Sequence, residues 1–150
     1  MCNPPFYSSS EELISSAASK QRPPFTACTG SPNEMVTPGG EVAFISRMID
    51  ESLFIKDDCQ WFTSMVGKLS SLTPLIEKLR LHEIDNYAVT EFVQGSKTRR
   101  WALGWSFGDL RPNVGICRGT TAVGKSLLPF PPEFVHDVSR CSGFLVYANW

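Results

Sequence analysis

Arg100-Trp101-Ala102-Leu103-Gly104-Trp105-Ser106-Phe107 is the most regular alternating stretch of the sequence. Successive side chains of a β-strand point to opposite faces, so a strand here would gather the large apolar residues on one face: Trp101, Leu103, Trp105 and Phe107. Aromatic residues that alternate along one strand face are typical of a buried core. We therefore expect them to belong to the core and not to a platform for stacking bases.

Two further strands are expected before this stretch. Residues 87–93 are rich in β-forming residues, and the polar segment 94–99 that follows them predicts a hairpin with the alternating strand. Residues 61–66 form a short apolar and aromatic run that ends at Gly67, as a buried strand does.

Two helices are expected between these strands and the N-terminal part of the chain. The first would run from Thr37 to about Lys56, with Thr37 as a possible cap and Pro38 in the first turn. Glu41 would suit the positive end of its dipole. The second helix would open at Thr73-Pro74.

The order of these elements predicts an α/β domain of the doubly wound kind, whose last two strands form an antiparallel pair. A sheet of this kind opens on a strand, a glycine-rich turn and a helix when it binds a nucleotide cofactor. The sequence contains no G-x-G-x-x-G stretch that could form such a turn. The cofactor cradle is therefore missing from the expected elements.

The chain begins with a motif that carries chemistry, Cys2-Asn3-Pro4-Pro5-Phe6. The Asn3 side-chain oxygen and the Pro4 main-chain carbonyl could accept hydrogen bonds from both hydrogens of an aromatic amine. Two prolines fix the backbone and supply no competing N–H, and Phe6 offers a ring on which a base can stack. Asn-Pro-Pro also occurs as a plain turn, so the motif alone leaves both interpretations open.

Composition excludes several classes of protein. The chain has 150 residues, 42% of them hydrophobic, and a net charge of −1, which excludes a strongly basic nucleic-acid module. No run is long and apolar enough for a membrane span, and the N-terminus has no signal-peptide pattern, so we expect no membrane partner and no secretion. The five cysteines form no C-x-x-C pair, which favours reduced thiols and predicts no metal site.

Residues 7–40 are rich in Ser, Thr, Pro and Gly and predict a long loop beside the motif, with a helical turn or two near residues 11–18. The loop contains the basic residues Lys20 and Arg22. A second basic group, Lys97, Arg99 and Arg100, lies at the hairpin turn, and Lys68 follows the strand 61–66. Each of these could contact an RNA backbone, which needs only positive surface charge, or could be an ordinary solvated residue.

Four ordered stretches resemble one family of enzymes. The stretches are residues 1–6, residues 39–45, residues 61–68, and residues 91–95 with 100–107. Together they resemble the C-terminal half of the catalytic domain in the family of RNA adenine-N(6) methyltransferases that includes methyltransferase-like protein 16 and RlmF. The resemblance covers residues 1–107 and leaves residues 108–150 as an unassigned tail.

This resemblance implies a Rossmann-like class I methyltransferase fold, S-adenosylmethionine as the methyl donor, no metal, and an unpaired adenine in structured RNA as the acceptor. U6 small nuclear RNA or ribosomal RNA would be the type of partner, and the nucleus or cytoplasm the location. The motif residues would carry the catalytic role: Asn3 and Pro4 as acceptors for the amine, Pro5 as the rigid element and Phe6 as the stacking ring. The long loop would border the RNA groove, which makes Lys20 and Arg22 phosphate contacts. The donor-binding residues of the family lie mostly upstream of this sequence, so the chain alone is expected to be inactive.

Two other functions remain open from the sequence. The chain could be a non-catalytic RNA-binding or interaction remnant. Residues 119–126 also match the phosphate-loop pattern G-x-x-x-x-G-K-[ST], although three prolines soon after it would stop the helix that such a loop needs. A truncated sheet has a physical consequence as well: the strand 61–66 is expected to present an open edge.

Overall fold

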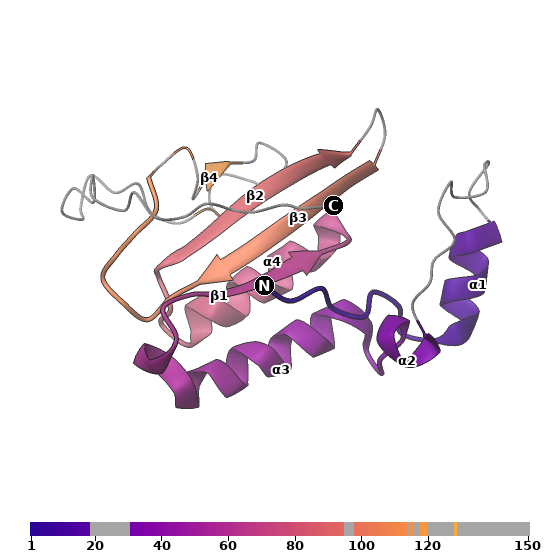
Figure 1. The fold of residues 1–150 in the computed structure, drawn as a ribbon, viewed down its shortest axis with the longest axis horizontal. Helices are drawn as coiled ribbons and strands as arrows, with labels where there is room; N and C mark the ends of the chain where they lie inside the picture. Colours follow the sequence, from indigo (N-terminus) through magenta and orange to yellow (C-terminus); the bar gives the residue numbers. More distant parts are fainter. Residues whose placement is uncertain (19–30, 95–97, 114, 116–117, 120–127, 129–150) are drawn as a thin grey trace.

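A four-stranded sheet forms the centre of the computed structural model, which describes residues 1–18, 31–94, 98–113, 115, 118–119 and 128 (Figure 1). The strands are β1 (Phe62–Val66), β2 (Tyr87–Gln94), β3 (Thr98–Trp105) and β4 (Arg118–Gly119). Their order across the sheet is β1-β3-β2-β4.

Strand β3 lies between β1 and β2 and is antiparallel to both. Trp105 at the end of β3 is opposite Phe62 of β1 and Tyr87 of β2. Strands β1 and β2 therefore run parallel to each other, separated by β3. The predicted antiparallel pair of the last two long strands is confirmed. The sequence did not predict that the last of them would be inserted beside β1.

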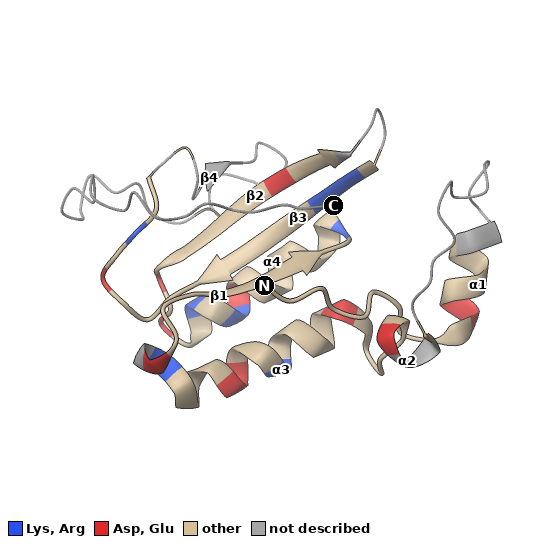
Figure 2. Ribbon diagram, viewed as in Figure 1, with Lys and Arg blue, Asp and Glu red and all other residues tan. Residues whose placement is uncertain are grey.

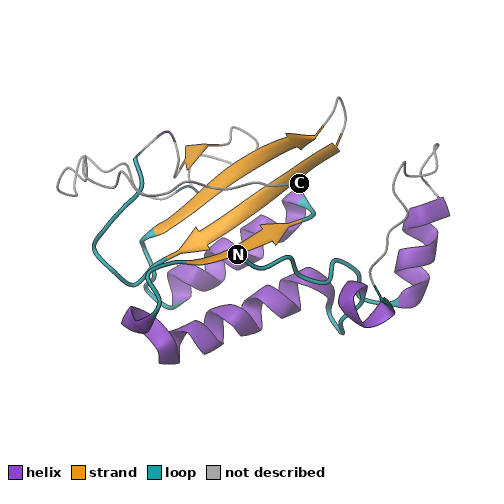
Figure 3. Ribbon diagram, in the orientation of Figure 1, coloured by secondary structure: helices purple, strands orange, loops and turns teal. Residues whose placement is uncertain are grey.

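Two helices cover one face of this sheet, α3 (Gly40–Ile55) and α4 (Leu69–Leu81) (Figure 3). Their apolar stripes meet the large side chains that alternate along the strands, and the resulting core contains these buried residues: Ile45, Ile49, Phe62, Val66, Leu72, Leu75, Ile76, Leu79, Ile84, Tyr87, Val89, Trp101, Leu103, Trp105 and Leu128. The short 3-10 helix η1 (Lys56–Asp58) ends α3.

The aromatic face predicted for the alternating stretch is core. Trp105 is fully buried and its ring stacks on Phe62 with centroids 5.7 Å apart. Phe107 follows the end of β3 and meets Phe62 edge-on at 6.0 Å. Trp101 is buried as well. Phe107 is partly buried and packs against this core.

The predicted starts of both helices were wrong. Helix α3 is preceded by Gly39, whose left-handed backbone (φ 77°) is one that glycine adopts without strain, so Thr37 is not its cap. Helix α4 begins at Leu69, and Pro74 lies inside it and not at its start. The earlier start depends on a side chain from α3, described below, that supplies the missing cap.

The segment 7–40 contains helices α1 (Ser10–Ala18) and α2 (Pro32–Met35). Its two ends are tied together, because Tyr7 N–H donates to the Met35 carbonyl and Thr37 N–H donates to the Tyr7 carbonyl, at 3.1 and 3.0 Å. Lys20, Arg22 and Lys97 lie outside the described residues, as do residues 120–126 of the phosphate-loop pattern.

Strand β1 has an open edge, as expected from the sequence. On the side away from β3, the described contact is a single parallel bridge between Ser64 and Cys2. The beginning of the tail, in contrast, is fixed to the sheet: Asn86 donates to the carbonyls of Gly108 and Leu110, and Arg111 pairs with Asp85 at 2.8 Å.

Candidate functional site

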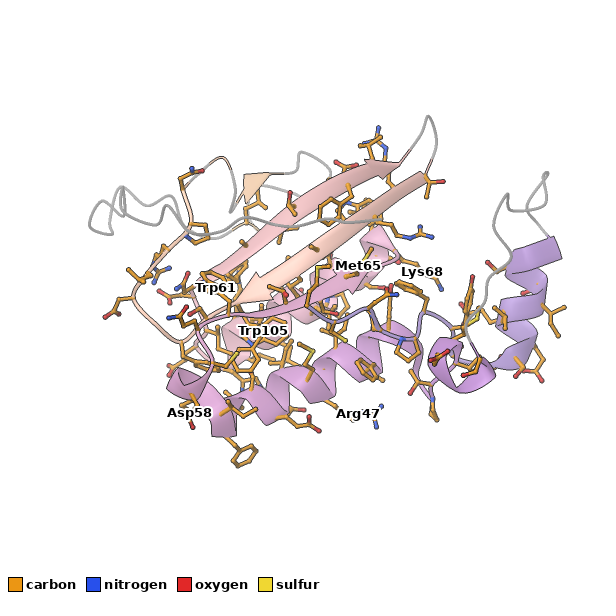
Figure 4. All side chains as sticks on the ribbon, viewed as in Figure 1. Arg47, Asp58, Trp61, Met65, Lys68 and Trp105 are labelled. Atoms are coloured by element: carbon orange, nitrogen blue, oxygen red, sulfur yellow. The ribbon has the colours of Figure 1, made fainter. Side chains whose placement is uncertain are left out.

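The Asn3–Phe6 motif is an extended segment held at both ends. At its start, Cys2 N–H donates to the Thr63 carbonyl (2.8 Å) and the Cys2 carbonyl accepts from Met65 N–H (2.9 Å). At its end, Tyr7 is tied to the α2–α3 connection. Figure 4 shows Met65 and Lys68 at the end of β1, next to this segment.

Within the motif the side chains differ in exposure. Pro4 is fully buried, whereas Asn3 is exposed and Phe6 is half-buried. A buried proline anchors the backbone while the neighbouring amide stays open to a ligand. The motif is thus a fixed backbone segment with one exposed amide side chain, Asn3.

The Phe6 ring occupies the space that a side chain at position 67 would take. A Cβ added to Gly67 would be 2.7 Å from the Phe6 Cδ1. On the ring, the Arg100 guanidinium lies 5.8 Å from the centroid, within the range of a cation–π contact. Phe6 is therefore positioned by a glycine of the β1–α4 turn and by an arginine of β3.

The buried carboxylate of Glu41 holds that same turn. Although Glu41 is in the first turn of α3, its oxygens accept from the N–H groups of Gly67 (2.6 Å) and Lys68 (3.0 Å) and from the Ser71 hydroxyl (2.6 Å). These donors lie at the N-terminus of α4, where backbone N–H groups have no partner within the helix. Glu41 is the cap that lets α4 begin at Leu69.

Lys68 forms an ion pair with Glu12 of α1, with Nζ and Oε1 2.6 Å apart. Glu12 also accepts from the backbone N–H and hydroxyl of Ser8. The hydrogen bonds from Lys68 and Ser8 lower the pKa of Glu12 to about 2. The hydrogen bond with Glu12 raises the pKa of Lys68. This pair attaches α1 to the turn that supports Phe6.

The two arginines of β3 have different surroundings. Figure 2 shows their basic segment next to an acidic position on β2. Arg99 pairs with that residue, Glu91. Arg100 instead reaches over Phe6. Of the basic residues predicted to contact RNA, the structure therefore brings Arg100 and Lys68 towards the motif, while Arg99 is directed to a neighbouring carboxylate.

Within the described ranges there is no group of three or more His, Cys, Asp or Glu residues that could hold a metal ion. None of the helices in this described part is long and apolar enough to cross a membrane.

Residues 1–109 match a protein family described as RNA methyltransferase. The chain belongs to this RNA methyltransferase family. It is 44% identical, over 126 residues, to the U6 small nuclear RNA (adenine-(43)-N(6))-methyltransferase of Schizosaccharomyces pombe, a match that covers 83% of this chain and 31% of the relative. It is 42% identical to the human RNA N(6)-adenosine-methyltransferase METTL16, covering 73% of this chain and 20% of that protein.

A bacterial relative, ribosomal RNA large subunit methyltransferase F of Pseudoalteromonas translucida, is 37% identical over 78% of this chain and 39% of its own length. Among solved structures, the hMettl16 catalytic domain in complex with the MAT2A 3'UTR hairpin 1 superposes with a TM-score of 0.64 at 40% identity, covering 75% of this chain and 40% of that one. The fold is thus part of a Rossmann-like methyltransferase domain. The chain spans between a fifth and two fifths of the lengths of these family relatives.

One helix start beside the motif, that of α4, is already occupied by a carboxylate of the protein. S-adenosylmethionine carries a carboxylate, which the N-terminus of a helix could bind. The start of α4 lies against the motif through Gly67, and its N–H groups at Gly67 and Lys68 already donate to Glu41. These two N–H groups are therefore not available to a donor carboxylate.

Sequence reasoning missed three residues that support the motif or its neighbouring turn: Glu41, Gly67 and Glu12. Glu41 was predicted to act only on its own helix dipole, and Gly67 only to end a strand. Their contacts join segments that are 26 to 56 residues apart in the chain, a relationship that no local pattern displays. Glu41 and Gly67 lie in residues 39–45 and 61–68, two of the stretches that resemble the family. That similarity was the one signal in the sequence that pointed to them.

Proposed function

We propose that the chain is the acceptor-side half of an RNA adenine-N(6) methyltransferase whose substrate is an unpaired adenine in structured RNA and whose methyl donor is S-adenosylmethionine. The names of the relatives support the reaction, because they refer to adenine-N(6) methylation of RNA. The match to a hairpin-bound catalytic domain supports the structured partner. A U6-type substrate implies a nuclear location.

The observation that carries this proposal is the anchored motif. Cys2 and Tyr7 are fixed by backbone hydrogen bonds, Pro4 is buried and Asn3 is exposed between them. An adenine amine is a weak nucleophile, since its lone pair is delocalised into the ring. Acceptors at Asn3 and Pro4 would hold its two hydrogens and favour a pyramidal nitrogen. When bound, the donor would supply the electrophilic methyl group.

The acceptor base must leave its helix to reach such a site. Phe6 would stack on the extruded adenine, and stacking of a base on an aromatic side chain contributes about 1–3 kcal/mol. Two described basic residues are next to this position. Arg100 lies over the Phe6 ring, and Lys68 belongs to the β1–α4 turn against which Phe6 packs. Lys20, Arg22, Lys97 and Arg99 are proposed as further contacts to the RNA backbone.

The test requires a protein with a donor site. The part of the fission yeast relative that precedes the matched region would be joined to this chain, and methylation of a hairpin with an unpaired adenine would be measured. Asn3→Ala is expected to abolish methylation, and Asn113→Ala, an exposed asparagine outside the motif, to retain it. Unchanged methylation by Asn3→Ala would remove Asn3 from the chemistry.

A second function is a non-catalytic RNA-binding module. It is favoured because the N–H groups at the start of α4 already donate to Glu41 and cannot bind a donor carboxylate. Calorimetry with the 150-residue chain tests whether the chain binds the methyl donor by itself. The acceptor-half proposal expects RNA binding without saturable binding of S-adenosylmethionine. Tight donor binding by this chain would contradict it. We also propose that residues 1–107 are the methyltransferase part, and residues 108–150 remain unassigned, although the described residues 118–119 and 128 among them belong to the sheet and the core.

A further inference from the structure

Glu41 joins the start of α3 to the β1–α4 turn and to the first turn of α4. It is 3% exposed, and its two oxygens accept the Gly67 N–H, the Lys68 N–H and the Ser71 hydroxyl. A buried carboxylate is costly unless its lone pairs are satisfied. Three donors at 2.6 to 3.0 Å satisfy them and fix the β1–α4 turn relative to the start of α3.

Phe6 lies between two glycines, Gly40 at the start of α3 and Gly67 in the β1–α4 turn. Its carbonyl oxygen would be 3.8 Å from a Cβ at Gly40, the residue before Glu41, and its ring fills the space beside Gly67. A Cβ at Gly67 would also be 3.1 Å from the Glu41 Oε2. The ring of Phe6 and the carboxylate of Glu41 therefore both border the space that a side chain at position 67 would occupy.

We propose that Glu41 is a positioning residue of the acceptor site, which acts on the substrate base through Gly67 and Phe6. This inference rests on the proposed function for the identity of the base. Without the carboxylate, the Gly67 and Lys68 N–H groups lose their hydrogen bonds to α3. The turn can then move away from α3. The Phe6 ring then loses the surface that sets its tilt under the adenine.

Glu41→Gln is the sharpest variant, because it keeps the shape of the side chain and changes its hydrogen bonding. A glutamine amide has one acceptor oxygen and an NH₂ group that is only a donor. Three donors converge on this position, so the NH₂ group would face at least one of them. Glu51→Gln, on the same helix and exposed, is the matched control for the loss of one negative charge.

The first measurement uses the 150-residue chain and does not depend on activity. In the unaltered chain, NMR should show a nuclear Overhauser effect between the Gly67 α-protons and the Phe6 ring, and slow exchange of the Gly67 amide. Glu41→Gln is expected to weaken the nuclear Overhauser effect and to accelerate exchange of the Gly67 amide, whereas Glu51→Gln leaves both unchanged. An unaltered Phe6–Gly67 contact in Glu41→Gln would overturn the proposal.

The second measurement uses the chimera that carries a donor site. Glu41→Gln is expected to lower kcat by about 10- to 100-fold, the range for a small misplacement of a reacting group, with little change in the KM for the RNA. Phe6→Leu should lower kcat as well, and the double variant should be no worse than the poorer single variant. Additive losses, or a loss that only follows the fraction of folded protein, would contradict a role through Phe6.

A chimera that fails to methylate would count against the proposed function and not against Glu41, since the NMR contact still decides the position of Phe6. If Glu41→Gln does not fold, Ser71→Ala replaces it, because it removes one donor and keeps the carboxylate. The expected result is a smaller change of the same kind in the Gly67 amide, and no change there would overturn the proposal.

Discussion

Lys68 Nζ lies 2.6 Å from Glu12 Oε1, and this ion pair connects α1 to the turn on which Phe6 packs. The two residues are 56 positions apart in the sequence. A contact between charged side chains at this place can both order α1 and occupy a lysine that RNA phosphates would otherwise attract.

The attachment of α1 should be sensitive to acid. In the folded chain the pKa of Glu12 is about 2, against an ordinary value of 4.5, because Lys68 and Ser8 donate hydrogen bonds to it. A lowered carboxyl pKa stabilises the fold fully above the ordinary value, and this contribution disappears as the pH falls from about 4.5 to about 2. Amide exchange in α1 should accelerate through that window, and Glu12→Gln should remove the dependence.

Releasing Lys68 should strengthen RNA binding. Glu12→Gln removes the carboxylate that competes with phosphates for the ammonium group, so we expect a severalfold higher affinity for a hairpin at low salt. Fluorescence anisotropy would measure it. The double variant Glu12→Gln with Lys68→Gln should lose this gain. Equal affinities of the unaltered chain and Glu12→Gln would show that Lys68 does not contact RNA.

Arg100 should contribute more to RNA binding than Arg99. Arg100 lies over the Phe6 ring, while Arg99 pairs with Glu91. Replacing a residue that neutralises one phosphate of a single strand lowers the salt slope by about 0.7. We expect this change for Arg100→Gln and a smaller one for Arg99→Gln, from titrations at several salt concentrations. The reverse order would place the RNA on the β2 side of the hairpin.

The hydrogen bond from the Trp105 indole to the Ser52 hydroxyl, 2.9 Å long and buried, should stabilise the core. Ser52→Ala would leave the indole N–H without an acceptor, at a cost of about 1–3 kcal/mol in the free energy of unfolding. Urea unfolding followed by tryptophan fluorescence would measure this. Ser46→Ala, a half-buried serine on the same helix, is the control and should cost less.

The open edge of β1 should make the chain self-associate. Edge strands with unpaired backbone groups are templates for another strand, and β1 is bridged there by Cys2 alone among the described residues. Sedimentation at rising concentration should show oligomers of the 150-residue chain. The chimera, which adds the segment that precedes Cys2, should remain monomeric under the same conditions. Equal behaviour of both would indicate that the edge is already protected.

Much of the fold could be predicted from local patterns. Alternation identified β3, and its aromatic face was correctly assigned to the core, because periodicity and burial are both properties of neighbouring residues. The α4 start could not be predicted in this way. Pro74 is a strong local signal for a first turn, but Glu41, supplied by α3, caps the helix five residues earlier.

The candidate site shows the same division. Asn3 to Phe6 could be predicted because their chemistry is contiguous in the sequence. The supporting residues Glu41, Gly67 and Glu12 come from three separate elements, and only the folded chain shows that they meet. The position of β3 between β1 and β2 was also beyond prediction, since strand order depends on packing between distant segments and not on any one of them.

The place of β3 in the sheet determines when the motif can become rigid during synthesis. Strands β1 and β2 leave the ribosome first, but their described partner is β3, which ends at Trp105. Pairing between distant segments forms late, so the strand that anchors Cys2 has no sheet to join until most of the domain has been made. The residues around Cys2 are thus fixed only after β3 has been made. Any truncation before Trp105 would release a nascent chain whose acceptor motif has never been assembled.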